Sequence, residues 1–175
     1  GAKVIQLQGK FVMPGLIDAH VHIRSFEAAK TALHSGVTTV RSMGVAHFMD
    51  VGMRELARKG AIDAPEFLAA GYHVRPSPDN GLYLDFPNLS HLMKDGITSQ
   101  EAIRTMAEAL ISKKIDWIKT NATARAGLPQ TDPREPYYQE EELKVLVQIG
   151  AESGIPVAAH AHGDEGGRAA VLAGV

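Results

Sequence analysis

The most constraining feature of this sequence is the repeated alternation of a short apolar run with a helix-like segment. Five such runs, which we predict to be strands, lie at residues 16–21, 37–43, 65–71, 115–120 and 155–160. Each run is short and almost continuously apolar, which is typical of parallel strands covered on both faces. Strands that alternate with helices predict right-handed βαβ units and one parallel sheet.

The segments between these runs carry helix signals. Residues 26–35 follow the first run, and residues 99–113 place Ile103, Met106, Ala107 and Leu110 on one face behind a Ser99 N-cap. Residues 139–153 begin with three glutamates, where the helix dipole favours negative charge, and Gly154 is placed to end that helix.

The length of 175 residues suggests about one domain. Five βα units, with Val175 as the possible start of a sixth strand, indicate an α/β fold that is part of a TIM-like (β/α)8 barrel, which typically takes ~250 residues. We therefore expect a fragment that lacks strands six to eight. The alternative is a complete five-stranded, doubly wound open sheet, although no Gly-x-Gly-x-x-Gly or P-loop pattern follows any predicted strand.

Composition limits the partners that we expect. With 18 Lys and Arg against 20 Asp and Glu, the chain has no basic excess to neutralise nucleic acid, and aromatic residues are only 6% of it. No apolar run reaches the ~18 residues of a membrane span. The absence of cysteine fits a reducing compartment, so we expect a cytoplasmic protein whose metal sites use His, Asp, Glu or modified Lys.

Two histidine pairs are the candidate metal ligands. His20 and His22 lie at the end of the first predicted strand, with Asp18 two residues earlier, and His160 and His162 repeat the arrangement at the fifth. Residues i and i+2 of a strand point to the same side, so each pair presents two imidazoles together. Three readings stay open: a shared metal, two satisfied polar side chains, or one ligand with a supporting neighbour.

Lys119 ends the fourth predicted strand and points away from Ile118. A lysine that faces a barrel interior needs compensation, because burial of an unpaired ammonium is costly. Carbamylation by carbon dioxide is one solution, since it creates an anionic oxygen ligand that can bridge two metals. The alternative is an ordinary exposed lysine at the end of a strand.

Two long connections, residues 72–98 and 122–138, follow strands and precede helices, which is the side where α/β folds bind ligands. Asn121 starts a pattern for N-glycosylation, but its place beside a strand end in a cysteine-free chain argues against that use.

These connections hold further candidates. His73 is the candidate catalytic residue and is placed either to donate to a substrate carbonyl or to orient a leaving group; otherwise it is a loop histidine with local bonds. Tyr72, His73 and Arg125 are the candidate substrate-binding residues, with Arg75 nearby. An arginine in this position suits a substrate carboxylate, although a surface role is the alternative.

Three segments in this order carry a family resemblance: Pro-Gly-Leu-Ile-Asp-Ala-His-Val-His at residues 14–22, Ile-Lys at 118–119 and Ala-His-Ala-His-Gly at 159–163. Together they resemble the amidohydrolase superfamily. They are most similar to its imidazolonepropionase-related branch, which includes metal-dependent dipeptidases of the prolidase type.

The resemblance extends over essentially the whole chain. Residues 4–10, within a segment that the sequence predicts as two very short strands over residues 3–12, resemble the passage of this family from a small β-sandwich into the barrel. The resemblance therefore implies that residues 1–13 end a β-sandwich domain. Residues 14–175 are then the N-terminal part of a metallo-dependent hydrolase barrel.

The resemblance also implies roles for the candidate residues. His20 and His22 would bind the more buried of two divalent ions, zinc being our expectation, and His160 would bind the other. Lys119, carboxylated, would bridge both ions. Asp18 and His162 are expected to support these ligands. The histidine after strand six and the aspartate after strand eight of the family have no counterpart among these 175 residues.

The implied function is hydrolysis of carbon–nitrogen bonds in amides, peptides or cyclic amides by a metal-activated hydroxide. The expected partner is a small-molecule or dipeptide-like substrate, with no nucleic acid and no membrane. The alternative is a non-catalytic half-barrel that binds metal or assembles with another chain. Exposed sheet edges would favour an oligomer or a complementing chain.

Overall fold

The structure, a computed structural model, describes residues 1–175 and is built on parallel strands. They form two three-stranded sheets, in the orders β1-β2-β3 and β4-β5-β6, and every pairing is parallel. The strands are β1 (Leu16–Val21), β2 (Val37–Ser42), β3 (Glu66–Leu68), β4 (His73–Val74), β5 (Ile118–Asn121) and β6 (Val157–His160).

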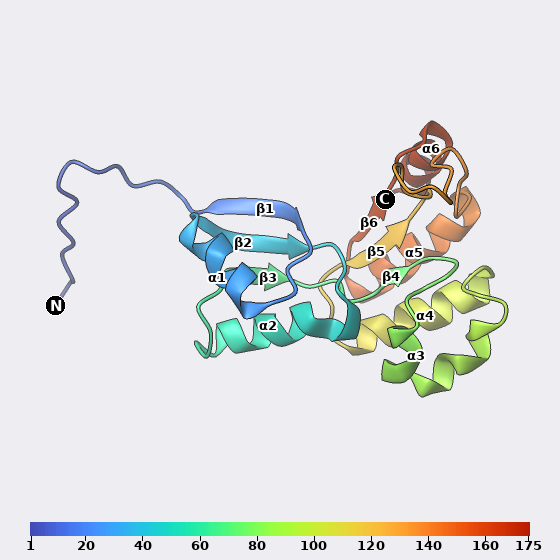
Figure 1. The fold of residues 1–175 in the computed structure, drawn as a ribbon, viewed down its shortest axis with the longest axis horizontal. Helices are drawn as coiled ribbons and strands as arrows, with labels where there is room; N and C mark the ends of the chain where they lie inside the picture. Colours follow the sequence, from blue (N-terminus) through green and yellow to red (C-terminus); the bar gives the residue numbers. More distant parts are fainter.

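β3 and β4 together occupy one strand position, at which the two sheets meet. β3 pairs with β2 and β4 pairs with β5, and only residues 69–72 separate β3 from β4. The order is therefore β1, β2, the β3 and β4 position, β5 and β6, which makes five consecutive positions of a parallel wall. Figure 1 shows the two sheets side by side, with α2 and α4 running along one side of them. This arrangement confirms the predicted partial barrel.

The helices fall between the strands, as the sequence predicts. Short local signals set their ends: the Ser25 and Ser99 side chains accept from backbone N–H groups in the first turns of α1 and α4, and Gly154 ends α5 with a φ of 68°. The helices are α1 (Phe26–His34), α2 (Met49–Arg58), α3 (Gly81–Asp85), α4 (Gln100–Ser112), α5 (Glu140–Ser153) and α6 (Asp164–Ala173), with 3-10 turns η1 (Ala46–Phe48) and η2 (Pro87–Met93).

The connection at residues 72–98 differs from the predicted long loop. It contains β4, α3 and η2, so His73 lies on a strand rather than in a loop. The predicted third strand is shorter than expected because the backbone turns at Gly71, whose φ is 66°, before pairing resumes in β4.

The N-terminal segment carries no strand. The two short strands predicted over residues 3–12 are absent, and the chain makes only a turn there, with the Lys10 N–H donating to the Leu7 carbonyl at 3.0 Å. Strands need a partner for their backbone groups, and this segment extends away from the sheets (Figure 1). Val175 is likewise not in a strand. The predicted domain boundary at residue 13 stays a prediction.

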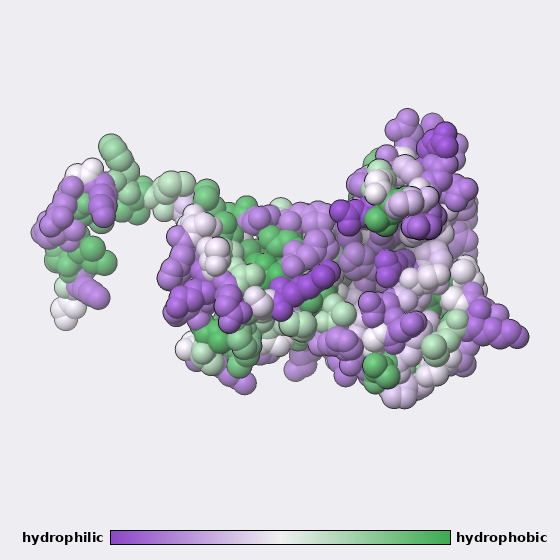
Figure 2. All heavy atoms as spheres, in the orientation of Figure 1, coloured by the Kyte–Doolittle hydropathy of each residue, from purple (hydrophilic) through white to green (hydrophobic).

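Burial differs strongly between the two sheets. A core cluster of 21 residues joins β4 and β5 to α4 and α5, whereas the cluster beneath β1–β3 has only five. All four residues of β5 are buried, but Leu16 and Ile17 of β1 are 49% and 72% exposed. Figure 2 shows hydrophobic residues along the N-terminal segment and over the region of β1 and β2, while the part around α6 is mostly hydrophilic.

None of the helices is both long enough and apolar enough to cross a membrane.

Candidate functional site

The carboxyl ends of β1, β4, β5 and β6 open into one polar cavity of about 790 Å³. Because the strands are parallel, side chains far apart in the sequence meet at this edge. Seven of the predicted site residues line the cavity: His20, His22, His73, Lys119, Arg125, His160 and His162. Its other walls are formed by Arg24, Gly44, Arg75, Asn121, Leu128, Thr131 and Tyr137.

The first histidine pair stands at the end of β1. The rings of His20 and His22 are edge to face, with centroids 5.3 Å apart. The Nδ1–H of His22 donates to the Gly44 carbonyl at 2.9 Å, which leaves Nε2 without a proton in the neutral ring. Metal-binding histidines are commonly oriented by such a bond. Asp18 accepts from the His20 backbone N–H at 3.1 Å and is not among the residues that line the cavity.

Lys119 is the most deeply buried charged candidate, at only 2% exposed. The alternative of an exposed lysine at a strand end is therefore wrong. Its side chain takes part in none of the ion pairs or hydrogen bonds of the structure. Arg41 is the charged group that affects the pKa of Lys119. Burial, helped by the Arg41 cation, lowers the pKa of Lys119 to about 8.

The second histidine pair stands at the end of β6. The rings of His160 and His162 are 4.1 Å apart at their centroids, and His160 Nε2 is buried with no hydrogen-bond partner. Burial, with a smaller effect of His162, lowers the pKa of His160 to about 4. His162 differs, because its Nδ1 accepts from the Ala126 N–H at 2.8 Å. That bond is consistent with the prediction that His162 supports the metal ligands.

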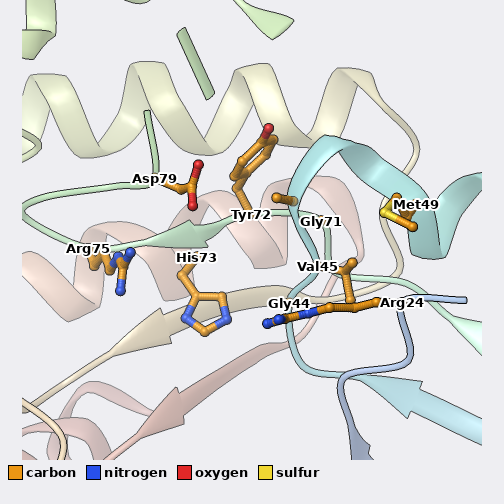
Figure 3. Close-up of a pocket in the computed structure, with 10 residues that line it drawn as sticks. Arg24, Gly44, Val45, Met49, Gly71, Tyr72, His73, Arg75 and Asp79 are labelled. Atoms are coloured by element: carbon orange, nitrogen blue, oxygen red, sulfur yellow. The ribbon is translucent and has the colours of Figure 1, made fainter. Parts of the chain in front are cut away.

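His73 and Tyr72 are neighbours in sequence but point to different surroundings. His73 faces the cavity and donates from Nδ1 to Asn121 Oδ1 at 2.9 Å, and burial lowers its pKa to about 4. The Tyr72 hydroxyl instead donates to Asp85 at 2.6 Å and lies 3.2 Å from His47 Nδ1. Burial and the Asp85 bond raise the pKa of Tyr72. Figure 3 shows the two side chains directed away from each other.

A second cavity of about 310 Å³ adjoins the first. Four residues line both cavities and so lie where the two adjoin: Arg24, Gly44, His73 and Arg75. Tyr72 lines the smaller cavity only. Neither Arg24 nor Arg75 forms an ion pair with a carboxylate, and the same holds for Arg125 in the larger cavity.

The cavity contains donor groups of the kinds that bind metal ions, but these groups are spread apart. No three His, Asp or Glu side chains come close enough together to hold an ion. The strand order explains this, because His20 and His22 lie at one edge of the five-position wall and His160 lies at the other. The chemistry of three groups in this cavity nevertheless fits a metal site. They are the unpartnered His160 Nε2, the free His22 Nε2 and the buried Lys119 amine.

Sequence reasoning missed six residues that line this cavity: Arg24, Gly44, Asn121, Leu128, Thr131 and Tyr137. Alternation along a strand is a signal for two of them, because Arg24 follows His22 by two residues and Asn121 follows Lys119 by two. Gly44 gives no such signal, and its φ of 111° becomes evident only in the fold. Asn121 is 9% exposed and hydrogen-bonded to His73, which agrees with the argument against glycosylation.

The fold and the cavity define the chain as part of a (β/α) barrel whose site lies at the carboxyl ends of its strands. Residues 11–175 match the family model described as the amidohydrolase family, and the chain belongs to that family. This confirms the resemblance inferred from the sequence.

Individual relatives match over shorter stretches. An adenine deaminase from Kosmotoga olearia is 56% identical over 45 residues, which cover 23% of this chain and 8% of that protein. A dihydroorotase from Thermococcus kodakarensis is 42% identical over 52 residues, which cover 25% of this chain and 13% of that protein.

Solved structures match the fold over nearly the whole chain. A prolidase complexed with N-methylphosphonate-L-proline superposes with a TM-score of 0.75 at 24% identity, covering 98% of this chain and 48% of the prolidase. An ochratoxinase from A. niger gives a TM-score of 0.74 at 21% identity, covering 93% of this chain and 46% of that protein. The chain thus spans about half the length of these structures.

Proposed function

We propose that this chain supplies the metal-binding wall of an enzyme that hydrolyses carbon–nitrogen bonds in amides, peptides or cyclic amides. His20, His22, His160 and carboxylated Lys119 are the residues that would hold its two divalent ions. The observation that carries the proposal is the Lys119 amine, which is buried without a partner on the same cavity wall as both histidine pairs.

A buried amine with no counter-charge is costly, and its chemistry suggests the remedy. The lowered pKa of Lys119, about 8, leaves roughly a tenth of the amine uncharged at pH 7, far more than for an ordinary lysine. An uncharged amine attacks carbon dioxide, forms an N–C bond and releases one proton, which gives an anionic carbamate. That anion has oxygen atoms suited to zinc and similar ions, as the neighbouring imidazoles are.

When bound, two such ions lower the pKa of water and polarise a carbonyl, which is the chemistry that hydrolysis needs. The residues of this chain would bind and orient the substrate. Arg24, Arg75 and Arg125 are cavity-lining guanidinium groups without acidic partners, so they suit a substrate carboxylate. This supports a dipeptide-like or other small anionic amide as the substrate.

A second candidate is a half-barrel without catalysis that binds metal or assembles with another chain. The observation that favours it is β1, whose outer edge is unpaired and whose Leu16 and Ile17 side chains are 49% and 72% exposed. Such an edge invites pairing with further strands or with a second copy. Under this alternative the protein binds metal but does not hydrolyse amides.

Metal content and hydrolysis separate these proposals. Elemental analysis of the full-length protein should find about two divalent ions per chain. Lys119→Ala should lose most of the metal and the hydrolysis of a panel of dipeptides and cyclic amides. Lys30→Ala is the matched control, because Lys30 is an exposed lysine on α1. Full-length protein with neither bound metal nor amidase activity would contradict the proposal, whereas metal without activity would favour the half-barrel.

A further inference from the structure

Arg41 on β2 makes two contacts on the inner face of the parallel wall, the face opposite α1 and α2. Its neighbour Val40 packs with Ala29 of α1 and Met53 of α2. Successive side chains of a strand point to opposite faces, so Arg41 points to the inner face. The Arg41 guanidinium takes part in none of the ion pairs of the structure.

The first contact is with β1, directly beside His20. Arg41 Nε donates to the Ala19 carbonyl at 2.8 Å. The register between β1 and β2 shifts between Asp18 and Val21, and this interval contains Ala19 and His20. Such irregularities in a strand re-aim the side chains next to them, and they are common beside active sites. The Arg41 bond therefore holds the irregular stretch of backbone that carries His20.

The second contact is with Trp117, which lies immediately before β5. Arg41 Cζ is 4.5 Å from the centroid of the Trp117 ring, within the range of a cation–π contact. Trp117 precedes Lys119 by two residues, so this contact holds the strand that carries Lys119. β1 and β5 are not neighbours in the sheets, because β2 and the position of β3 and β4 lie between them. Arg41 is thus a side-chain link between two strands that share no backbone hydrogen bonds.

Both contacts depend on the shape of a guanidinium group. Its flat face stacks on an aromatic ring while Nε–H donates at the edge in a fixed direction. A lysine could place its ammonium over Trp117 or near the Ala19 carbonyl, but its flexible stem carries a single point charge. Arginine is therefore the residue type that can make the two contacts together.

We propose that Arg41 is a positioning residue, which sets the spacing between the histidine pair on β1 and Lys119 on β5 through its contacts with Ala19 and Trp117. The inference rests on the proposed function for the presence of metal. Arg41 does not line the cavity, so it acts through the strands and not on the substrate.

The zinc affinity of the full-length protein, measured by competition with a chelator, tests this link. Arg41→Met keeps the length of the side chain but removes the guanidinium. Residues that orient metal ligands typically change metal affinity 10–100-fold, so zinc binding should weaken by about that factor. Arg41→Lys should recover only part of the loss. Trp117→Leu should also weaken zinc binding, whereas Trp117→Phe, which keeps an aromatic face, should weaken it less.

A double variant distinguishes one link from two independent effects. Arg41→Met and Trp117→Leu break the same contact, so together they should weaken zinc binding by less than the product of the two single effects. Two controls separate the site from general stability. Arg58→Met, at an exposed arginine on α2, and Ile103→Ala, in the core beside α4, should keep wild-type zinc affinity, the second despite its lower stability.

An unchanged zinc affinity in Arg41→Met would overturn the inference, as would single effects that multiply fully or an equal loss of affinity in Ile103→Ala. If Arg41→Met does not fold, Arg41→Lys and the two Trp117 variants decide the question in the same way. Wild-type protein that binds no zinc contradicts both proposals. Tight zinc binding that the Arg41 variants leave unchanged contradicts this inference alone.

Discussion

The carboxyl group of Asp50 offers a test of how the fold places the site. Asp50 is fully buried at the start of α2, and its Oδ2 accepts from the Ala70 N–H at 2.9 Å and the Gly71 N–H at 3.0 Å. Its Oδ1 accepts from the Val51 N–H at 3.0 Å. Ala70 and Gly71 lie in the break between β3 and β4, so Asp50 fixes the backbone that leads to His73.

Asp50→Ala leaves the N–H groups of Ala70 and Gly71 buried without an acceptor. Each unsatisfied buried donor costs about 1–3 kcal/mol, so the loss from these two groups is ~2–6 kcal/mol of unfolding free energy. That is a large share of the ~5–15 kcal/mol by which a domain is typically stable. Asp50→Asn keeps one acceptor oxygen, which can take the place of Oδ2 and accept from both N–H groups, so a smaller loss than for Asp50→Ala is expected.

The assay is urea unfolding of the full-length protein, followed by circular dichroism, with the midpoint and slope fitted together. Asp63→Ala is the matched control, because Asp63 is exposed and its side chain forms no hydrogen bond, so its change should stay within ~0.5 kcal/mol. An Asp50→Ala variant as stable as this control would refute the reasoning. It would mean that water or a rearranged backbone satisfies the two donors.

Two further predictions concern the Lys119 amine and the hydrophobic core. With ¹³C-labelled carbon dioxide held at a fixed dissolved concentration, carbamate formation at Lys119 should rise with pH through about 8 and then level off. At pH 8 the uncharged fraction is about 100-fold larger than for an ordinary lysine, so a rise near pH 10 would count against the burial argument. Ile103→Ala, in the fully buried face of α4, should lower the unfolding free energy by ~2–5 kcal/mol. Leu84→Ala, at a residue 77% exposed, should change it little in the same urea assay, and equal losses would be inconsistent with this core.

The sequence by itself determined the elements whose causes are local. β1 occupies the predicted residues 16–21, and α4 follows the predicted Ser99 cap with its four apolar positions all buried. These outcomes depend on propensity, capping and periodicity within a few residues of each position. The ordered motifs around His20, Lys119 and His160 likewise indicated the family from the sequence, because each motif is a short run of consecutive residues.

Tertiary structure alone decided features that join distant segments. The two-residue strand β4 exists because Val74 and His73 pair with β5 some 46 residues later, which no local pattern encodes. The burial of Lys119 depends on its place between β4 and β6, where it pairs with His73 and Ala158. The direction of Tyr72 is set by its bond to Asp85 on α3. In each case the deciding energy comes from contacts between segments that only folding brings together.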